Sequence, residues 1–538
     1  MILTDVLKRW QTLKSRNAIL CTGTDEHGLK IQQAAAKANA HPKEFCDAGA
    51  EVFKDLARKI DISEDIFIRT TDQKHKEGVE YAWQMLEEKG WIYESKHEGW
   101  YSVSDETFYP QGQVQLIVDP PTGRKMMVSV ETGKEVEWTS ERNYHFRLSA
   151  FQDALLELYR QYPDFIVPKT RMDEVIREVS TGLEDLSVSR PVERLQWGVR
   201  VPTDDSQTIY VWLDALLNYA TAAGYPFTPG SESAGGWPAD IHVVGKDIVR
   251  FHCIYWPAFL MALGLPLPKQ VLTHAHWTLG RQKMAKSTGN VVNPFFALER
   301  FGIDPLRWYL VQEGGISDDA DYDNRFVIEK YKKGLQGGLG NLSSRIMRGK
   351  GWDVPRAIKR YAHPEGGKHP PVSHESDERG RLQYGRLRAL PSKVEAHMTS
   401  LHPNRALKET MNAVYDMNGF LQAASPWTLV TKLQELAADM TGQQIHEASK
   451  AGQGPEELEA EIDRVIYMAA EALRLVGIML QAFIPSSAKR LLDMLGVAEE
   501  RRNWEWCEMG KDDAYGVPFV SLGKGEKGVL FPRLTSDF

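Results

Sequence analysis

Short apolar runs of strand length alternate with longer amphipathic stretches over the first part of the chain. The runs at 17–22 and 66–71 predict buried strands, and the apolar spacing over 42–60 and 74–89 predicts helices. Strands that alternate with helices are typical of a parallel sheet covered by helices. The pattern therefore predicts an α/β fold, in which ligands bind beyond the carboxyl ends of the strands.

The pattern changes between Trp91 and about Val167, where short runs are separated by proline and glycine turn signals. This texture predicts an inserted module of antiparallel strands. Apolar runs of strand length return at 209–215, 240–247 and 271–276. We expect these three runs to complete the α/β part of the chain.

Beyond about Arg307 the pattern is helical nearly to the end. Apolar residues at helical spacing predict long amphipathic helices at 382–398, 403–424 and 458–480, which together favour a helix bundle. The interval from Gly351 to about Arg379 is rich in glycine, proline, histidine and charge, and its periodicity is weak. We therefore predict a surface connection there.

Composition narrows the class of protein. The chain has 538 residues, of which 42% are hydrophobic and 26% charged, as in soluble globular proteins. A net charge of -8 excludes a wholly basic nucleic-acid coat protein but allows a local basic patch. The four cysteines have no paired spacing, so neither a zinc knuckle nor a disulfide framework is expected. No apolar run approaches the length of a membrane span.

The first sixteen residues allow two interpretations. Apolar residues at helical spacing are accompanied by several basic residues, as in a mitochondrial presequence. Asp5 and the unbroken continuation into the first strand favour a buried domain helix instead.

The most distinctive candidate site is the loop from Gly280 to Asn290. Lys283 and Lys286 lie three residues apart between glycines, and Ser287 follows the second lysine. Glycine lets a loop approach a ligand closely, and lysines supply the point charges that suit a polyphosphate. Composition alone leaves a basic surface loop as the alternative.

Residues at predicted strand ends are further candidates. Asp25 could hold an ammonium group by charge-assisted hydrogen bonds, although a turn aspartate that caps the next helix gives the same pattern. Gly245 and Asp247 end a later strand, where an ordinary helix start is the alternative. Two sets of residues share predicted faces, with core packing as the alternative: Ile248, Phe251 and His252, and Trp212, Ala215 and Tyr219.

Together these segments resemble the methionyl-tRNA synthetases, in particular the mitochondrial and bacterial-like forms that lack zinc cysteines. The loop is similar to the Lys-Met-Ser-Lys-Ser signature of class I aminoacyl-tRNA synthetases, with Ala285 in place of serine. The resemblance extends from Leu3 to Phe531 and includes the segments 341–345 and 426–427.

The resemblance implies a class I Rossmann-type parallel sheet, split by a β-rich connective insert and followed by an all-α anticodon-binding bundle. The implied domains are, in order, residues 1–95 as the first part of the catalytic domain, 96–168 as the insert, 169–280 as the second catalytic part, 281–340 as the signature loop and stem-contact region, and 341–538 as the anticodon-binding domain.

The resemblance also implies an activity. The protein would be a methionine–tRNA ligase, which activates methionine with ATP to methionyl-adenylate and transfers the methionyl group to tRNA(Met) in mitochondrial translation. It would use ATP with Mg²⁺ and no structural zinc. It would work as a monomer in the mitochondrial matrix, without membrane association.

Residue roles follow from the resemblance position by position. The implied methionine site comprises Asp25, Trp212, Ala215, Tyr219, Ile248, Phe251 and His252. The implied ATP site comprises Gly245, Asp247, Lys283, Lys286 and Ser287, with Lys283 and Lys286 as the catalytic residues. The implied anticodon readers are Asn341, Arg345 and Trp427.

One departure from the family pattern stands out. The His-Ile-Gly-His signature occurs nowhere in the sequence, so we expect the chain to begin just after it and to lack the central strand of the sheet. The alternative function is therefore a catalytically impaired tRNA-binding fragment that lacks adenylate formation. An ATP–pyrophosphate exchange assay beside a tRNA filter-binding assay separates the two.

Overall fold

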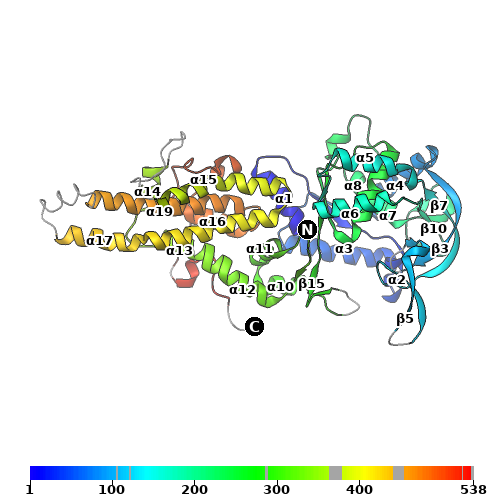
Figure 1. Ribbon diagram of the computed structural model, residues 1–538, viewed down its shortest axis with the longest axis horizontal. Coiled ribbons are helices and arrows are strands. Elements are labelled where there is room, and N and C mark those ends of the chain that lie inside the picture. Colours follow the sequence, from blue (N-terminus) through cyan, green and yellow to red (C-terminus); the bar gives the residue numbers. More distant parts are fainter. Residues whose placement is uncertain are drawn as a thin grey trace. The chain divides into compact units, whose positions relative to one another are not determined.

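The structure, a computed structural model, describes residues 1–103, 107–119, 123–284, 289–362, 378–439, 454–523 and 525–534. The chain divides into two compact units (Figure 1). The first unit comprises Met1–Ala18, Lys59–Ser63 and His276–Phe538, and the second comprises Ile19–Arg58 and Glu64–Ala275. The chain therefore leaves the first unit twice before completing it.

The second unit contains the predicted parallel strands, which form two sheets among the described residues. β1 (Cys21–Thr24) pairs with β2 (Ile66–Arg69) in one sheet. In the other, β14 (Gln270–His274) pairs with both β13 (Ile241–Gly245) and β8 (Ile166–Val167). All three pairings are parallel, and the α/β prediction is confirmed.

Helices enclose an aromatic-rich core in this unit. They are α2 (Leu29–Lys37), α3 (Pro42–Lys59), α4 (Gln73–Glu88), α5 (Gln152–Gln161), α6 (Lys169–Ser180), α7 (Val211–Leu216), α8 (Asn218–Ala222) and α9 (Trp256–Leu263). Trp83, Phe146, Tyr159, Trp256 and Phe259 are at most 2% exposed and belong to one hydrophobic cluster. Such a cluster excludes water from the inner ends of the elements that carry the candidate site.

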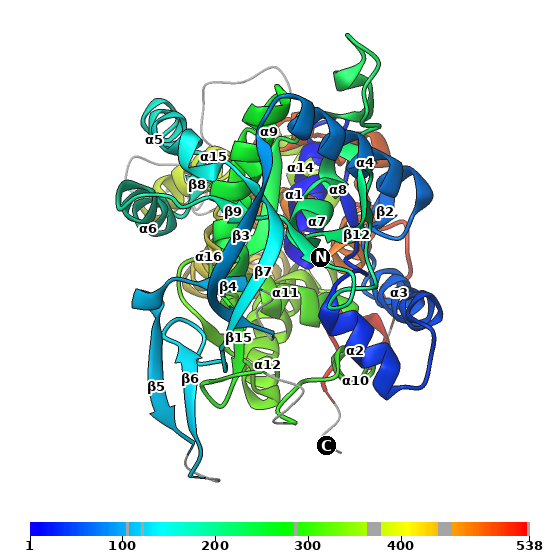
Figure 2. The same cartoon turned by 90° about the vertical axis from the view of Figure 1, so that its right-hand side faces the viewer.

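The predicted β-rich insert is also present. Its longest strands, β3 (Ile92–Ser102) and β7 (Glu137–Phe146), are antiparallel and lie side by side in Figure 2. β4 (Thr107–Tyr109) continues this sheet, and β5 (Val114–Val118) forms a separate hairpin with β6 (Lys125–Ser129). The shorter strands that follow are β9 (Leu186–Ser187), β10 (Ser189–Pro191), β11 (Arg200–Val201) and β12 (Asp204–Ile209).

The strand predicted at 209–215 is wrong. β12 ends at Ile209, and the helix α7 begins two residues later. Five of the six residues of α7 are buried, so its sequence is apolar at nearly every position. A short helix that is buried all round has the same continuous apolar pattern as a buried strand.

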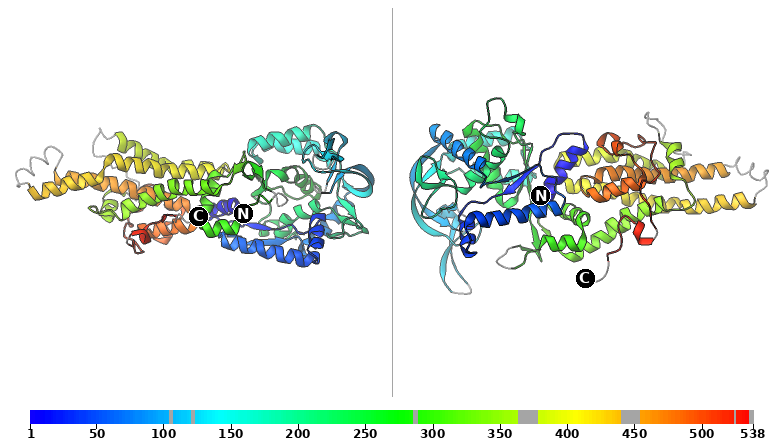
Figure 3. Two further views of the ribbon diagram at one scale, coloured as in Figure 1. Left: turned by 90° about the horizontal axis from the view of Figure 1, so that it is seen from below. Right: turned by 180° about the vertical axis from the view of Figure 1, so that it is seen from behind.

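The first unit contains the predicted helix bundle, whose yellow and orange helices run alongside one another in Figure 3. The predictions for 382–398, 403–424 and 458–480 are confirmed by the helices α15, α16 and α19. The elements of this unit are α1 (Ile2–Leu13), β15 (Trp277–Leu279), β16 (Gln282–Lys283), α10 (Pro294–Phe301), α11 (Ile303–Glu313), β17 (Ala320–Asp321), α12 (Asn324–Lys330), α13 (Asn341–Met347), α14 (Val354–Tyr361), α15 (Glu378–Thr399), α16 (Pro403–Ala424), α17 (Pro426–Asp439), α19 (Pro455–Leu480) and α20 (Pro485–Leu495).

A buried glutamate attaches the C-terminal segment to the bundle. Glu471 on α19 accepts hydrogen bonds from Arg474 at 2.6 Å, from the Tyr515 hydroxyl at 2.7 Å and from the Gly510 amide at 2.7 Å. Glu471 and Arg474 are both fully buried, so each charge depends on the other for compensation.

A second buried ion pair connects three sequence segments of the first unit. Asp5 on α1 and Arg307 on α11 are fully buried and bonded to each other. Asp5 also accepts from the Ser63 amide at 2.8 Å, and Arg307 donates to the Phe483 carbonyl at 3.0 Å. Burial alone would raise the pKa of Asp5, but the Arg307 charge and the Ser63 hydrogen bonds outweigh it and lower that pKa.

We expect Asp5→Ala to destabilise the protein by about 3–5 kcal/mol, because it leaves the Arg307 guanidinium buried without its counter-charge. Urea denaturation of the full chain would measure the loss. The control is Glu329→Gln, which breaks the exposed ion pair between Glu329 and Lys333, a class of pair that contributes little to stability. Equal midpoints for Asp5→Ala and the unaltered protein would contradict this account.

Candidate functional site

The turn after β1 places Asp25 at the carboxyl end of a parallel strand. Asp25 is exposed, whereas the next two residues, Glu26 and His27, are buried. Gly23 permits the close approach of β1 to β2, because a Cβ there would lie 1.9 Å from the Ile68 carbonyl oxygen. The aspartate therefore projects from a backbone whose following residues are anchored in the core.

Glu26 is anchored by three side chains from its surroundings. Its carboxylate accepts from Arg69 at 2.7 and 2.8 Å and from the Thr24 hydroxyl at 2.6 Å, and the Thr71 hydroxyl also donates to it. Burial would raise the pKa of Glu26, but these hydrogen bonds, with Arg69 foremost, lower it. The carboxylate therefore stays charged and fixes the turn from one side.

Asp214 fixes the same turn from the other side. This aspartate of α7 is 1% exposed and lies 2.6 Å from Nδ1 of His27 and 2.8 Å from Nε2 of His75 on α4. Burial would raise the pKa of Asp214, yet the two histidines lower it to about 2. Because His27 is only two residues from Asp25, the network connects the ammonium candidate to the helix that carries Trp212 and Ala215.

The predicted side-chain pocket is brought together from α7, α8 and the turn after β13. The rings of Trp212 and Phe251 stack with centroids 3.6 Å apart and an interplanar angle of 11°. The Tyr219 hydroxyl lies 2.6 Å from Nε2 of His252. Phe251 and His252 belong to a π-helical turn, Phe251–Tyr255, a rare geometry that is frequent at functional sites.

Hydrogen bonding defines the protonation of the polar pair. Nδ1 of His252 lies 3.0 Å from the Ile248 carbonyl, which can only accept, so Nδ1 carries the hydrogen. Burial lowers the pKa of His252 to about 4, so the ring is neutral near pH 7 and Nε2 accepts from Tyr219. Burial raises the pKa of Tyr219, and the charge of Asp25 contributes to that increase.

Gly245 and Asp247 lie where predicted, at the carboxyl end of β13. Gly245 pairs in register with His274, and Asp247 is exposed in the turn that follows. Asp247 lines a cavity of about 770 Å³ together with Lys246 and Arg250. Glu178, which forms an ion pair with Arg250 at 2.7 Å, lines the same cavity.

The lysine loop belongs to the first unit and begins with a tight β-hairpin. β15 and β16 are antiparallel and joined by Gly280 and Arg281, whose φ angles of 60° and 61° are those of a type I′ turn. Asp321 accepts from the Arg281 amide at 2.9 Å and holds this turn. Lys283 is exposed on β16. Lys286 and Ser287 lie outside the described residues.

The three anticodon candidates lie together in the bundle. The Arg345 guanidinium is 4.9 Å from the centroid of the Trp427 ring, and 37% of Trp427 is exposed. Asn341 donates to Asn418 at 3.0 Å and Arg345 donates to Gln422 at 3.3 Å, both on α16. Trp427 is therefore not a core tryptophan, and its ring is available beside polar groups.

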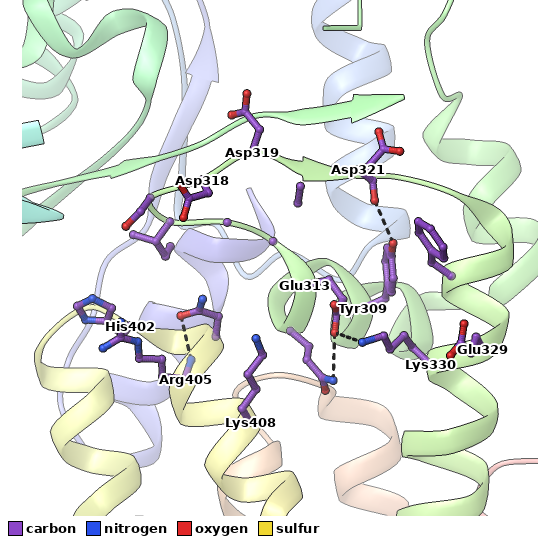
Figure 4. A pocket seen from close by; sticks show the side chains of 18 residues that line it. Tyr309, Glu313, Asp318, Asp319, Asp321, Glu329, Lys330, His402, Arg405 and Lys408 are labelled. Carbon is purple, nitrogen blue, oxygen red and sulfur yellow. Dashed lines mark hydrogen bonds and ion pairs between the residues drawn. The ribbon is translucent and has the colours of Figure 1, made fainter. Parts of the chain in front are cut away.

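Figure 4 shows a different cavity of the first unit, of about 590 Å³. Glu313 and Lys330 form an ion pair across part of its wall at 3.0 Å. Arg405 and Lys408 contribute further cations, and Asp318 lies on the loop that follows α11. None of the predicted site residues lines this cavity, and its mixed charge singles out no class of ligand.

Neither a metal site nor a membrane-spanning helix occurs among the described residues. In this part of the chain no three histidine, cysteine or acidic side chains are grouped so that they could hold a metal ion. None of the helices described here combines the length and apolar character that crossing a bilayer requires.

Comparison with known proteins identifies the family. The model described as "tRNA synthetases class I (M)" matches residues 1–347, and with the α/β fold and helical bundle it defines a class I tRNA synthetase. A probable mitochondrial methionine–tRNA ligase of Neurospora crassa is 50% identical over 539 residues, 100% of this chain and 82% of that protein. The mitochondrial methionine–tRNA ligase of Bos taurus is 39% identical, over 95% of this chain and 83% of that protein.

A solved structure agrees. Mycobacterium tuberculosis methionyl-tRNA synthetase bound by methionyl-adenylate is 33% identical, with a TM-score of 0.81 over 99% of this chain and 95% of that one. The chain therefore belongs to the methionine–tRNA ligase family.

Sequence reasoning missed the residues that hold the predicted ones in place. Asp214 and His75 were not among the candidates, although an aspartate inside the apolar run 211–216 is itself a sign of a buried, paired carboxylate. Arg69 was likewise not among the candidates. These residues act through their neighbours and carry no motif of their own.

We expect Asp214→Asn to raise KM for methionine in ATP–pyrophosphate exchange more than KM for ATP. The amide presents an N–H₂ group to one of the two histidines, and leaving a buried polar group unsatisfied costs about 1–3 kcal/mol. The matched control is Asp205→Asn, which alters an exposed carboxylate of β12. Equal changes in both KM values would indicate general unfolding of the unit, which thermal melting would reveal.

Proposed function

We propose that this member of the methionine–tRNA ligase family activates methionine with ATP to methionyl-adenylate and then transfers the methionyl group to tRNA(Met) in mitochondria. The observation that carries the proposal is the Tyr219–His252 pair, placed beside the Trp212–Phe251 stack in the unit that also carries Asp25. One carboxylate, one polar pair and apolar walls match the three chemical features of methionine.

Each feature of methionine has a partner in this arrangement. The Asp25 carboxylate holds the substrate ammonium by charge-assisted hydrogen bonds. Ala215, Ile248 and the two stacked rings form the walls for the methylene groups. The Tyr219–His252 pair faces the thioether, because apolar walls alone discriminate a missing methylene only about 10–200-fold.

In this proposal, backbone groups and cations bind ATP. Gly245 and Asp247 at the end of β13 contact the nucleotide, and Lys283, Lys286 and Ser287 bind its phosphates. Mg²⁺ accompanies ATP, in keeping with its usual binding through substrate phosphates and one or two carboxylates. The two lysines stabilise the charge that develops on the phosphates during adenylate formation.

The anticodon is read by the bundle. Trp427 offers a stacking face to an unstacked base, while Asn341 and Arg345 bond to base edges, which is how single-stranded RNA loops are recognised. Asn418 and Gln422 hold the two polar readers in position.

Each domain has a separate role in the proposed function. Catalysis belongs to residues 1–95 and 169–280, the insert to 96–168, the signature loop and stem contact to 281–340, and anticodon binding to 341–538. The protein works as a monomer in the mitochondrial matrix without structural zinc. Sedimentation of the purified chain tests the monomeric state, and its metal content tests the expected lack of structural zinc.

We expect Lys286→Ala to slow adenylate formation while methionine binding changes little. Losing one preorganised charge at a developing anion typically costs about 10²–10³ in rate. ATP–pyrophosphate exchange measures this step, and Lys269→Ala, which removes an exposed lysine paired with Asp240, is the control. An unchanged exchange rate would remove the loop from the catalytic site. Absence of exchange in the unaltered protein would instead favour a tRNA-binding protein without adenylate formation.

We expect Trp427→Ala to leave exchange intact and to weaken aminoacylation of tRNA with a CAU anticodon. Stacking of a base on an aromatic side chain is worth about 1–3 kcal/mol. Trp427→Phe, which retains a stacking face, should recover part of the lost kcat/KM. If exchange falls together with aminoacylation, the tryptophan serves the fold rather than the anticodon.

A further inference from the structure

Two of the anticodon candidates, Arg345 and Trp427, form only part of the wall of the cavity on which they lie. This cavity of about 340 Å³ is lined by Arg345 and Trp427, but also by a second arginine, Arg348, and a second tryptophan, Trp352. Neither Arg348 nor Trp352 has a role in the proposed function. The additional wall comes from the end of α13 and the loop that follows it.

Trp352 is held so that its one polar atom is already satisfied. Its indole N–H donates to the Ile346 carbonyl at 3.1 Å, near the end of α13. Gly349 makes room for the ring, since a Cβ there would lie 1.9 Å from Cζ2 of Trp352. The indole is only partly buried, so apolar ring surface remains available to a ligand.

The loop that carries Trp352 is packed on the helix that carries Trp427. Gly351 has a φ of 99°, and a Cβ at this position would lie 2.5 Å from a methyl group of Val430 on α17. Trp427 lies one turn earlier on the same helix. Close packing of Gly351 on α17 thus fixes the two tryptophans as walls of one cavity.

The charge of the cavity is cationic. Arg345 pairs with an amide, Gln422, and Arg348 donates to the Gly525 carbonyl at 3.2 Å. Among the described residues that line the cavity there is no carboxylate. Aromatic faces together with arginines that lack acidic partners are the combination that binds bases and phosphates of single-stranded nucleic acid.

We propose that Trp352 and Arg348 form a second nucleobase subsite, which holds an unstacked base of the same anticodon loop beside the base on Trp427. Trp352 supplies the stacking face and Arg348 donates to the edge of that base. The inference rests on the proposed function only in taking tRNA as the partner. Its competitor is a purely structural role, in which Trp352 closes the end of α13.

The test compares Trp352→Leu, Trp352→Phe and Arg348→Gln in the full-length protein. For each variant, kcat/KM for aminoacylation is measured with the CAU tRNA and with three transcripts that each carry one altered anticodon base. ATP–pyrophosphate exchange and the melting temperature are measured in parallel. Arg388→Gln, an exposed arginine of α15, is the matched control for charge.

We expect Trp352→Leu to lower kcat/KM for the CAU tRNA by about five- to 150-fold, the range that stacking of one base provides. Trp352→Phe should recover part of this loss. Arg348→Gln should reduce discrimination at a single anticodon position and leave discrimination at the other two unchanged. Exchange should stay at the level of the unaltered protein.

Two results would overturn the inference. An equal loss for all four transcripts by Trp352→Leu, accompanied by a lower melting temperature, would show that the ring only supports α13. Unchanged aminoacylation by both Trp352→Leu and Arg348→Gln would show that no base reaches this wall. If Trp427→Ala is also without effect, the anticodon site itself is misplaced; if Trp427→Ala weakens charging, only the second subsite fails.

Discussion

A carboxylate can be buried only if other segments supply its partners, and this requirement connects distant parts of the chain. In the first unit Asp5 depends on Arg307, and Glu471 depends on Arg474 and Tyr515. In the second, Asp214 depends on His27 and His75. Removing one partner would leave an uncompensated charge in a medium of low dielectric, which is far more costly than losing an exposed pair. The positions of α1, α7 and the C-terminal segment therefore follow from charge compensation as much as from apolar packing.

Local pattern predicted the long helices of the bundle. The helix expected at 403–424 is observed with those bounds because its apolar residues recur on one face. Prediction failed at α7, which has no exposed face, and at α14, which lies in the interval read as a surface connection. In α14, Val354, Ala357 and Ile358 do keep helical spacing. The helix is only eight residues long, however, and the glycine- and proline-rich sequence around it masks that signal.

The residues of the candidate site also divide into those that the sequence indicated and those that it did not. Asp25, Trp212 and His252 were among the candidates because the resemblance assigns them to the proposed methionine site. Asp214 could not be paired with its histidines in advance, since they lie 187 and 139 residues away and tertiary folding alone brings them together. The position of Trp352 could not be predicted for a related reason. Gly349 and Gly351 make room for its loop, and this packing is visible only in the folded structure.

The position of Asp214 between Trp212 and Ala215 has a consequence for redesign of amino-acid specificity. A change that shifts α7 also shifts His27, because Asp214 is bonded to it. In the proposed methionine site, a wall altered for a bulkier side chain would therefore disturb the binding of the substrate ammonium by Asp25. Among the described residues, the stretch from Ile248 to Phe251 makes no hydrogen bond to Asp214, His27 or His75, although Phe251 stacks on Trp212. Libraries aimed at non-natural analogues therefore have more freedom at Ile248, where the shape of the proposed pocket can vary without a direct change to the Asp214 network.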